Sequence, residues 1–73
     1  MENETFFVII HPDDGIMGID YQSGGYPWFP KTIREAAKFL TVEKANEYIA
    51  SFKSYDRMKG CFVCKATISY SKV

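Results

Sequence analysis

Residues 5–15 constrain the fold more than any other part of this 73-residue sequence. Residues 5–11 are a run of β-branched and aromatic side chains, and residues 12–15 (Pro-Asp-Asp-Gly) are typical of a tight turn. A strand followed by such a turn predicts a hairpin, with its second strand over residues 15–22. Because Phe6, Val8 and Ile10 are apolar, as are Phe7 and Ile9 between them, we expect the first strand to be covered on both faces.

The middle of the chain has a different character. Residues 23–30 (Ser-Gly-Gly-Tyr-Pro-Trp-Phe-Pro) contain two prolines, which exclude a helix and disfavour a central strand. Thr32 and Glu35 have the spacing of a capping box, which predicts a helical turn over residues 32–36. We expect a short extended piece over residues 38–40 before the next element.

Two regular elements are predicted in the second half. Thr41 is a suitable N-cap, and apolar residues then recur at helical spacing, which predicts an amphipathic helix over residues 41–53. Apolar and polar residues alternate over residues 60–70, which is typical of a strand with one face toward solvent. The apolar stripe of the helix consists of Val42, Ala45, Ile49 and Phe52.

These elements predict a single α+β domain over residues 1–73. Its small antiparallel sheet combines the N-terminal hairpin with the C-terminal strand, and one amphipathic helix packs on one face. The sheet residues expected beneath the helix are Val8, Ile10, Phe62, Cys64 and Ile68. So few strands leave a sheet edge free, which allows a homodimer formed by edge pairing or through an aromatic patch.

The charges cancel overall but are unevenly distributed. Nine basic and nine acidic residues give a net charge of zero, so no global field attracts nucleic acid or anionic lipid. Residues 1–30 carry five carboxylates and no Lys or Arg, whereas residues 31–73 carry nine basic and four acidic side chains. Such asymmetry indicates either a charged binding face or two halves that neutralise each other by packing together.

The sequence also predicts a location. Its longest apolar run covers residues 6–10, far short of the roughly 20 residues of a membrane helix. The acidic N-terminus is unlike a secretory signal, and two cysteines are too few for a disulfide framework. We expect a cytoplasmic protein with both thiols free and no membrane partner.

Two groups of residues have the composition of reactive sites. Cys61 and Cys64 have the spacing of a zinc knuckle, but on a strand residues three apart point to opposite faces, so we interpret them as structural. His11 with Asp13 and Asp14 lacks an orienting third group for nucleophilic catalysis, and a turn accounts for these residues. We therefore expect no enzyme, no cofactor and no metal site.

Aromatic residues crowd the segment before the helix. Rings that cover the end of the sheet would explain them, and so would an anchor patch for a protein partner, because Tyr and Trp dominate binding hot spots. Neighbouring carboxylates would steer such a patch toward a basic surface. The favoured function is a non-catalytic protein-binding module, and its candidate residues are Asp13, Asp14, Asp20, Tyr21, Tyr26, Trp28 and Phe29.

The alternative function is nucleic-acid binding. Tyr26 and Trp28 would stack on bases while basic side chains downstream contact phosphates. The candidate phosphate contacts are Lys31, Arg34, Lys38 and Lys44. The absence of a net positive charge counts against this alternative.

Residues 24–28 (Gly-Gly-Tyr-Pro-Trp), 35–39 (Glu-Ala-Ala-Lys-Phe) and 41–45 (Thr-Val-Glu-Lys-Ala) resemble a pattern in small uncharacterised accessory proteins of tailed bacteriophages. The resemblance covers about residues 5–50 and departs from the pattern at Lys44, where those proteins have a doubled acid. It implies a phage or prophage origin and a role in host takeover or counter-defence. In this role the chain would inhibit or modulate a host defence or nucleic-acid-processing protein in the host cytoplasm. The resemblance transfers no catalytic residue.

Overall fold

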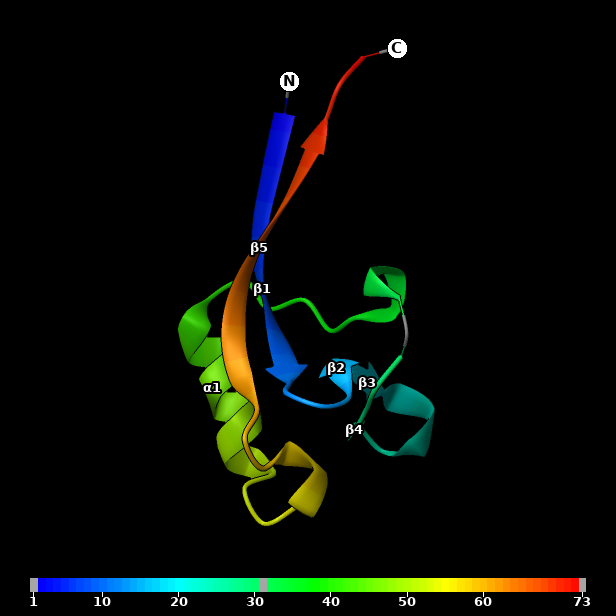
Figure 1. Cartoon of the computed structure of the whole chain (residues 1–73), viewed down its shortest axis with the longest axis vertical. Coiled ribbons are helices and arrows are strands. Elements are labelled where there is room, and N and C mark those ends of the chain that lie inside the picture. Colours follow the sequence, from blue (N-terminus) through cyan, green and yellow to red (C-terminus); the bar gives the residue numbers. More distant parts are fainter. Residues whose placement is uncertain (1, 31, 73) are drawn as a thin grey trace.

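Strand β1 (Glu2–His11) is the central strand of the sheet in the computed structural model, which describes residues 2–30 and 32–72. The short strand β2 (Gly15–Ile16) pairs antiparallel with one edge of β1, and β5 (Phe62–Tyr70) pairs antiparallel with the other. The sheet order is therefore β2–β1–β5 (Figure 1). The predicted hairpin and the central position of the first strand are confirmed.

The second strand of the hairpin is shorter than predicted. Only residues 15 and 16 pair with β1, and after Met17 the chain forms β3 (Gly18–Asp20), which pairs with β4 (Tyr26–Trp28) in a separate two-stranded sheet. The prediction of one strand over residues 15–22 was wrong because a later segment occupies the place beside β1. Phe39 exchanges two backbone hydrogen bonds of 2.8 Å with Phe7, and Met17 marks the point where the chain changes partner.

The helical elements follow the local signals closely. Helix α1 (Val42–Ser51) begins after Thr41, whose hydroxyl accepts a hydrogen bond from the N–H of Lys44 at 3.1 Å. Short 3-10 turns form at η1 (Tyr21–Ser23), η2 (Ile33–Glu35) and η3 (Asp56–Met58). The turn expected over residues 32–36 is present as η2, but the side chain of Thr32 makes no capping hydrogen bond.

The buried stripe of α1 is centred on Ala45, which is fully buried. Val42 and Tyr48 lie three positions to either side of Ala45 and so about 60° to opposite sides of it on the helix. The ring of Tyr48 packs against Phe39 and Phe52, whereas Val42, the first residue of the helix, is 41% exposed. The expectation that Val42 is buried was therefore wrong, whereas Ile49 and Phe52 lie against the core as predicted.

Helix α1 covers the face of the sheet opposite to the expected one. Cross-strand partners share a face, and the pair Ile9 and Val63 belongs to the core cluster with Ala45. Val8 is buried on the other face, and Phe62, expected in the core, is 48% exposed. The error arose because both faces of β1 are apolar, so the alternation of β5 did not decide which face the helix would cover.

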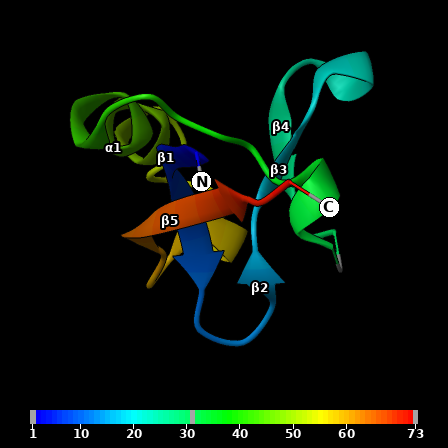
Figure 2. The ribbon, with the colours of Figure 1, turned by 90° about the horizontal axis from the view of Figure 1, so that it is seen from above.

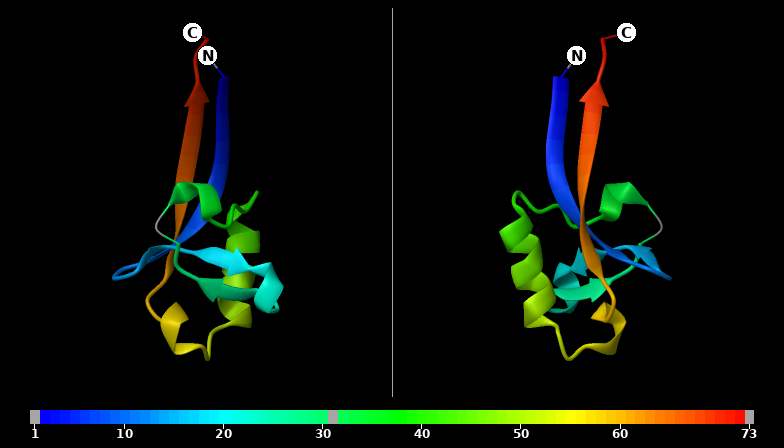
Figure 3. Two further views of the ribbon diagram at one scale, coloured as in Figure 1. Left: turned by 90° about the vertical axis from the view of Figure 1, so that its right-hand side faces the viewer. Right: turned by 60° about the vertical axis from the view of Figure 1, so that its left-hand side comes forward.

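The molecule has a body and two projections. The body consists of the sheet around Ile9 together with α1. The ribbon of β3 and β4, with η1 at its tip, lies on the same side of the sheet as the helix (Figure 2). Residues 2–5 of β1 and 67–70 of β5 project as an arm (Figure 3), which makes the chain elongated at 45 × 23 × 23 Å. The chain thus has the predicted α+β fold, a small antiparallel sheet with one helix on a face.

Candidate functional site

The ribbon presents three exposed aromatic side chains. Tyr21 is 80% exposed, Tyr26 is 54% exposed and Trp28 is 39% exposed. A short tip positions them: the Oδ1 atom of Asp20 accepts hydrogen bonds from two backbone N–H groups of η1, at 3.1 and 3.2 Å. The chain then turns back through glycines 24 and 25, whose φ angles of 89° and 83° disfavour residues with a Cβ.

Tyr21 and Trp28 line a shallow hollow of about 440 Å³. Asp20 lies at the same hollow, and Ile19 and Gln22 complete its lining. Two aromatic rings beside a carboxylate favour a cationic side chain, because the ring faces and the carboxylate both attract positive charge. We regard this hollow, the ribbon hollow, as the leading candidate site.

Gly18 controls the position of the Trp28 ring. A Cβ atom on residue 18 would lie 2.8 Å from the indole Nε1 of Trp28 and 2.7 Å from the carbonyl oxygen of Glu35. Both distances are too short for real contacts, so only glycine leaves room for the indole at this place. The indole of Trp28 therefore packs against the backbone at Gly18, while 39% of the residue stays exposed.

Aromatic contacts attach the ribbon to the helix. The hydroxyl of Tyr48 donates a hydrogen bond of 2.8 Å to the carbonyl of Gly25, and the ring of Tyr26 meets Phe52 and Tyr55 edge-on, at centroid distances of 5.5 and 6.2 Å. Burial, with smaller contributions from nearby tyrosines, raises the pKa of Tyr48 to about 12. Tyr48 therefore keeps its proton, and its hydrogen bond to the ribbon persists, well above neutral pH.

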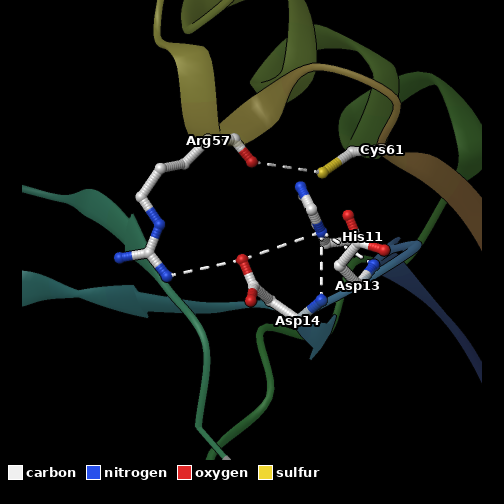
Figure 4. Close-up of polar contacts among 5 residues, drawn as sticks. All are labelled: His11, Asp13, Asp14, Arg57 and Cys61. Carbon is white, nitrogen blue, oxygen red and sulfur yellow. Dashed lines mark hydrogen bonds and ion pairs between the residues drawn. The ribbon is translucent and has the colours of Figure 1, made fainter.

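The acidic turn between β1 and β2 is held by internal contacts (Figure 4). The Nδ1 atom of His11 accepts hydrogen bonds from the backbone N–H groups of Asp13 and Asp14, both at 3.0 Å. The Oδ2 atom of Asp14 lies 3.7 Å from that Nδ1 and 3.6 Å from Nη2 of Arg57. The positive charge of Arg57 thus partly neutralises Asp14, one of the two carboxylates of this turn that were expected to attract a basic partner surface.

Phe29 is partly buried next to this turn. The guanidinium of Arg57 lies over its ring at 4.8 Å, and the His11 ring meets it edge-on at 5.4 Å. A second shallow hollow, of about 520 Å³, lies beside these residues and is lined by Asp13, Asp14 and Arg57 among others. The contacts of Phe29 are those of a structural residue that supports the turn.

Both cysteines are free, as expected, and both are half-buried, although Cys64 was expected in the core beneath the helix. The Sγ atom of Cys61 approaches the carbonyl oxygen of Arg57 at 3.9 Å. Burial, and to a smaller extent the charge of Asp14, raises the pKa of the Cys61 thiol. A thiol that stays protonated is a poor nucleophile, which fits a packing role for Cys61.

The seven residues predicted for protein binding therefore divide among three places. Asp20, Tyr21 and Trp28 meet at the ribbon hollow. Asp13, Asp14 and Phe29 lie at the acidic turn, and Tyr26 contacts the end of α1. The sequence prediction missed Ile19, Gln22 and Arg57; proximity to Asp20 was an available signal for the first two, but nothing local linked Arg57 to Asp14.

Three of the four basic residues of the alternative function are described, and they lie on η2, on the segment after it and on α1. Lys31 lies outside the described residues. Arg34 is exposed on η2, the ammonium of Lys38 lies 5.8 Å from the Phe6 ring centroid, and Lys44 on α1 lies 3.7 Å from a carboxylate oxygen of Glu47. The contacts of Lys38 and Lys44 are with other parts of the protein.

Metal binding and a membrane-spanning helix have no support in residues 2–30 and 32–72. Within these residues no three or more His, Cys, Asp or Glu side chains are grouped so that they could hold a metal ion. The same part of the chain contains no helix of the length and apolar character needed to cross a membrane. Comparison with protein-family models, curated proteins and solved structures finds no match to this chain. The resemblance to phage accessory proteins therefore stays a prediction.

Proposed function

We propose that this chain is a non-catalytic protein-binding module that uses the ribbon hollow as its contact surface. The observation that carries the proposal is the exposure of Tyr21 and Trp28, 80% and 39%, around one hollow beside Asp20. Large aromatic side chains left in solvent without a structural need are typical of binding hot spots. A small chain has few large apolar side chains to form its core, so rings that it leaves exposed favour the binding of a partner at this surface.

The ribbon is preorganised for binding. The hydroxyl of Tyr48 donates a hydrogen bond to the ribbon backbone at Gly25, and the ring of Tyr26 packs on Phe52. The indole of Trp28 packs against the backbone at Gly18. A contact surface whose backbone is already ordered loses little entropy on association. This arrangement favours a surface that binds with little rearrangement.

The chemistry of the hollow suggests the kind of partner. The aromatic residues Tyr21 and Trp28 beside the acidic Asp20 favour an Arg or Lys side chain on the partner surface. If the chain derives from a phage, as the resemblance implies, the partner is a host protein that the chain inhibits or modulates. A basic surface on a nucleic-acid-processing or defence protein would fit this charge.

Variant-dependent capture from a bacterial lysate tests the proposal. Tyr21→Ala and Trp28→Ala should each weaken binding by about tenfold or more, as truncation of a hot-spot ring does. Leu40→Ala is the matched control, because Leu40 is 85% exposed but lies outside the ribbon. All variants are first shown to keep the circular dichroism spectrum of the parent.

Selective loss of a captured protein by the two ribbon variants supports the proposed surface. Equal capture by all variants, or loss only with Leu40→Ala, contradicts it. The fluorescence of Trp28, the single tryptophan, gives a parallel test with single-stranded and duplex DNA. Strong quenching by DNA that weakens with added salt would favour the nucleic-acid alternative instead.

A further inference from the structure

The outer edge of β5 is open. Strand β5 pairs with β1 along one side, and no strand within residues 2–30 and 32–72 pairs with its other side. Its register with β1 is unbroken over nine residue pairs, and its sequence contains no proline. Bulges, prolines and lysines are common ways to block an exposed edge; β5 has no bulge and no proline, and its one lysine is Lys65.

The hydrogen bonds that β1 makes on the side away from β5 show which residues of β5 direct their backbone N–H and C=O groups toward the open edge. Phe7 bonds to Phe39, and the carbonyl of Ile9 accepts from Met17, so both direct their backbone groups away from β5. Along an antiparallel strand, successive residues direct their backbone groups to opposite sides. Phe6 and Val8 therefore form their backbone hydrogen bonds with β5, where their partners are Ala66 and Cys64. The residues of β5 whose backbone groups face the open edge, called the outward residues, are therefore Val63, Lys65, Thr67 and Ser69.

These four residues are arranged symmetrically about Ala66. We infer that two copies of this chain pair antiparallel through the outer edges of β5, with Ala66 opposite Ala66 of the second copy. Thr67 then faces Lys65 of the second copy, and Val63 faces Ser69. Every outward residue gains a hydrogen-bonded partner, and each such pair exchanges two backbone hydrogen bonds. The two sheets become one continuous six-stranded sheet with two-fold symmetry.

The side chains fit this register. Lys65 is the only charged residue of β5, and it faces an uncharged Thr67 across the interface. The two Lys65 side chains are diagonal neighbours, so like charges do not oppose each other directly. At the symmetry axis the small Ala66 side chain allows the close approach of a pair without hydrogen bonds.

The arm makes this edge accessible. Residues 67–70 of β5 project beyond the body in Figures 1 and 3, and Thr67 and Ser69 are exposed. An interface built on one strand edge is smaller than the roughly 1,200 Å² at which stable complexes begin. The dimer should therefore be weak, present at about 100 μM and dissociated at about 1 μM.

Cysteine cross-linking tests the register directly. Opposed residues without mutual hydrogen bonds have Cα atoms about 4.5 Å apart, which is within disulfide range. Ala66→Cys should therefore give a covalent dimer, twice the 8.4 kDa chain, under mild oxidation at about 100 μM. Peptide mapping should find residue 66 joined to residue 66.

Thr67→Cys is the matched control. Its side chain is more exposed than that of residue 66, but in this register the two copies of residue 67 are diagonal, beyond the roughly 7 Å that a disulfide spans. It should cross-link no more than the parent, whose Cys64 residues lie far from each other across the axis. Equal cross-linking of both variants, or none with Ala66→Cys, overturns the inference.

Charge at Thr67 gives a second test that leaves the core untouched. Thr67→Lys places a like charge opposite Lys65 twice per dimer, and Thr67→Glu places an opposite charge there. Sedimentation equilibrium should show a dissociation constant about fivefold higher for the first variant and about fivefold lower for the second than for the parent. Identical dissociation constants, or a parent that is only monomeric at about 100 μM, contradict the pairing.

Discussion

The body and the ribbon use their large side chains in opposite ways. In the body, three apolar residues are fully buried, and their burial stabilises the helix and strands that cover them: Ile9, Met17 and Ala45. In the ribbon, Tyr21 and Trp28 remain exposed although the backbone beneath them is well anchored. The difference indicates that the body provides stability and the ribbon provides a surface, so changes in the two regions should have different consequences.

The largest effect is expected in the body. Ile9→Ala removes a fully buried side chain at the centre of the core and should lower the free energy of unfolding by about 2–5 kcal/mol. Urea denaturation followed by circular dichroism measures this, with Leu40→Ala as the exposed control at within about 0.5 kcal/mol of the parent. A loss below about 1 kcal/mol for Ile9→Ala would contradict the assigned core.

Gly18→Ala tests the support of the ribbon. The added Cβ would meet the Glu35 carbonyl oxygen at 2.7 Å and the Trp28 indole at 2.8 Å, so the ribbon must shift. We expect a loss of about 1–3 kcal/mol in the free energy of unfolding, together with red-shifted Trp28 fluorescence. An unchanged emission maximum and unchanged stability would show that Trp28 does not rest on residue 18.

Tyr48→Phe tests the bond between the ribbon and the helix. Loss of the hydrogen bond to Gly25 should cost about 1 kcal/mol of unfolding free energy at neutral pH. In the parent, the pKa of Tyr48 is about 12 when folded and near 10 when unfolded, so the unfolded state loses its proton first. Stability from Tyr48 is therefore complete below pH 10 and is lost as the pH rises from 10 to 12.

The matching measurement is denaturation at pH 9 and pH 11. The stability difference between the parent and Tyr48→Phe should narrow at the higher pH, because only the parent loses the contribution of this hydroxyl. A difference that is constant or grows with pH would contradict the assigned environment of Tyr48.

Tyr21→Ala should have the smallest effect on stability. The ring is 80% exposed, so we expect a change within about 0.5 kcal/mol in the free energy of unfolding, measured by urea denaturation. The same variant is expected to bind its partner about tenfold more weakly, so stability and binding should separate at this residue. A loss of stability comparable to that of Ile9→Ala would mean that the ring belongs to the core.

Local signals predicted much of the fold. The turn at residues 12–15, the apolar run before it and the N-cap at Thr41 each act over a few residues, and each produced the expected element. The change of partner at Met17 was not predictable in this way. It depends on Phe39 occupying the place beside Phe7, a competition between segments more than 20 residues apart in the sequence.

The candidate site was predictable to a similar extent. Asp20, Tyr21 and Trp28 are close in sequence, and the ribbon brings them to one hollow. Asp14 and Phe29 were expected at the same surface, but Arg57 holds them at the acidic turn. The opposite charges of the two halves of the chain hinted at such neutralisation without indicating which residues would meet.

Hydrogen–deuterium exchange, measured on the chain alone and on its complex with a captured partner, tests most directly whether the ribbon is the contact surface. Binding at the ribbon hollow should slow exchange of amides within residues 18–28, and the amides of α1 should exchange as they do in the free chain. Slowed exchange confined to α1 or to the arm, with residues 18–28 unchanged, would contradict the assignment of the ribbon as the binding surface.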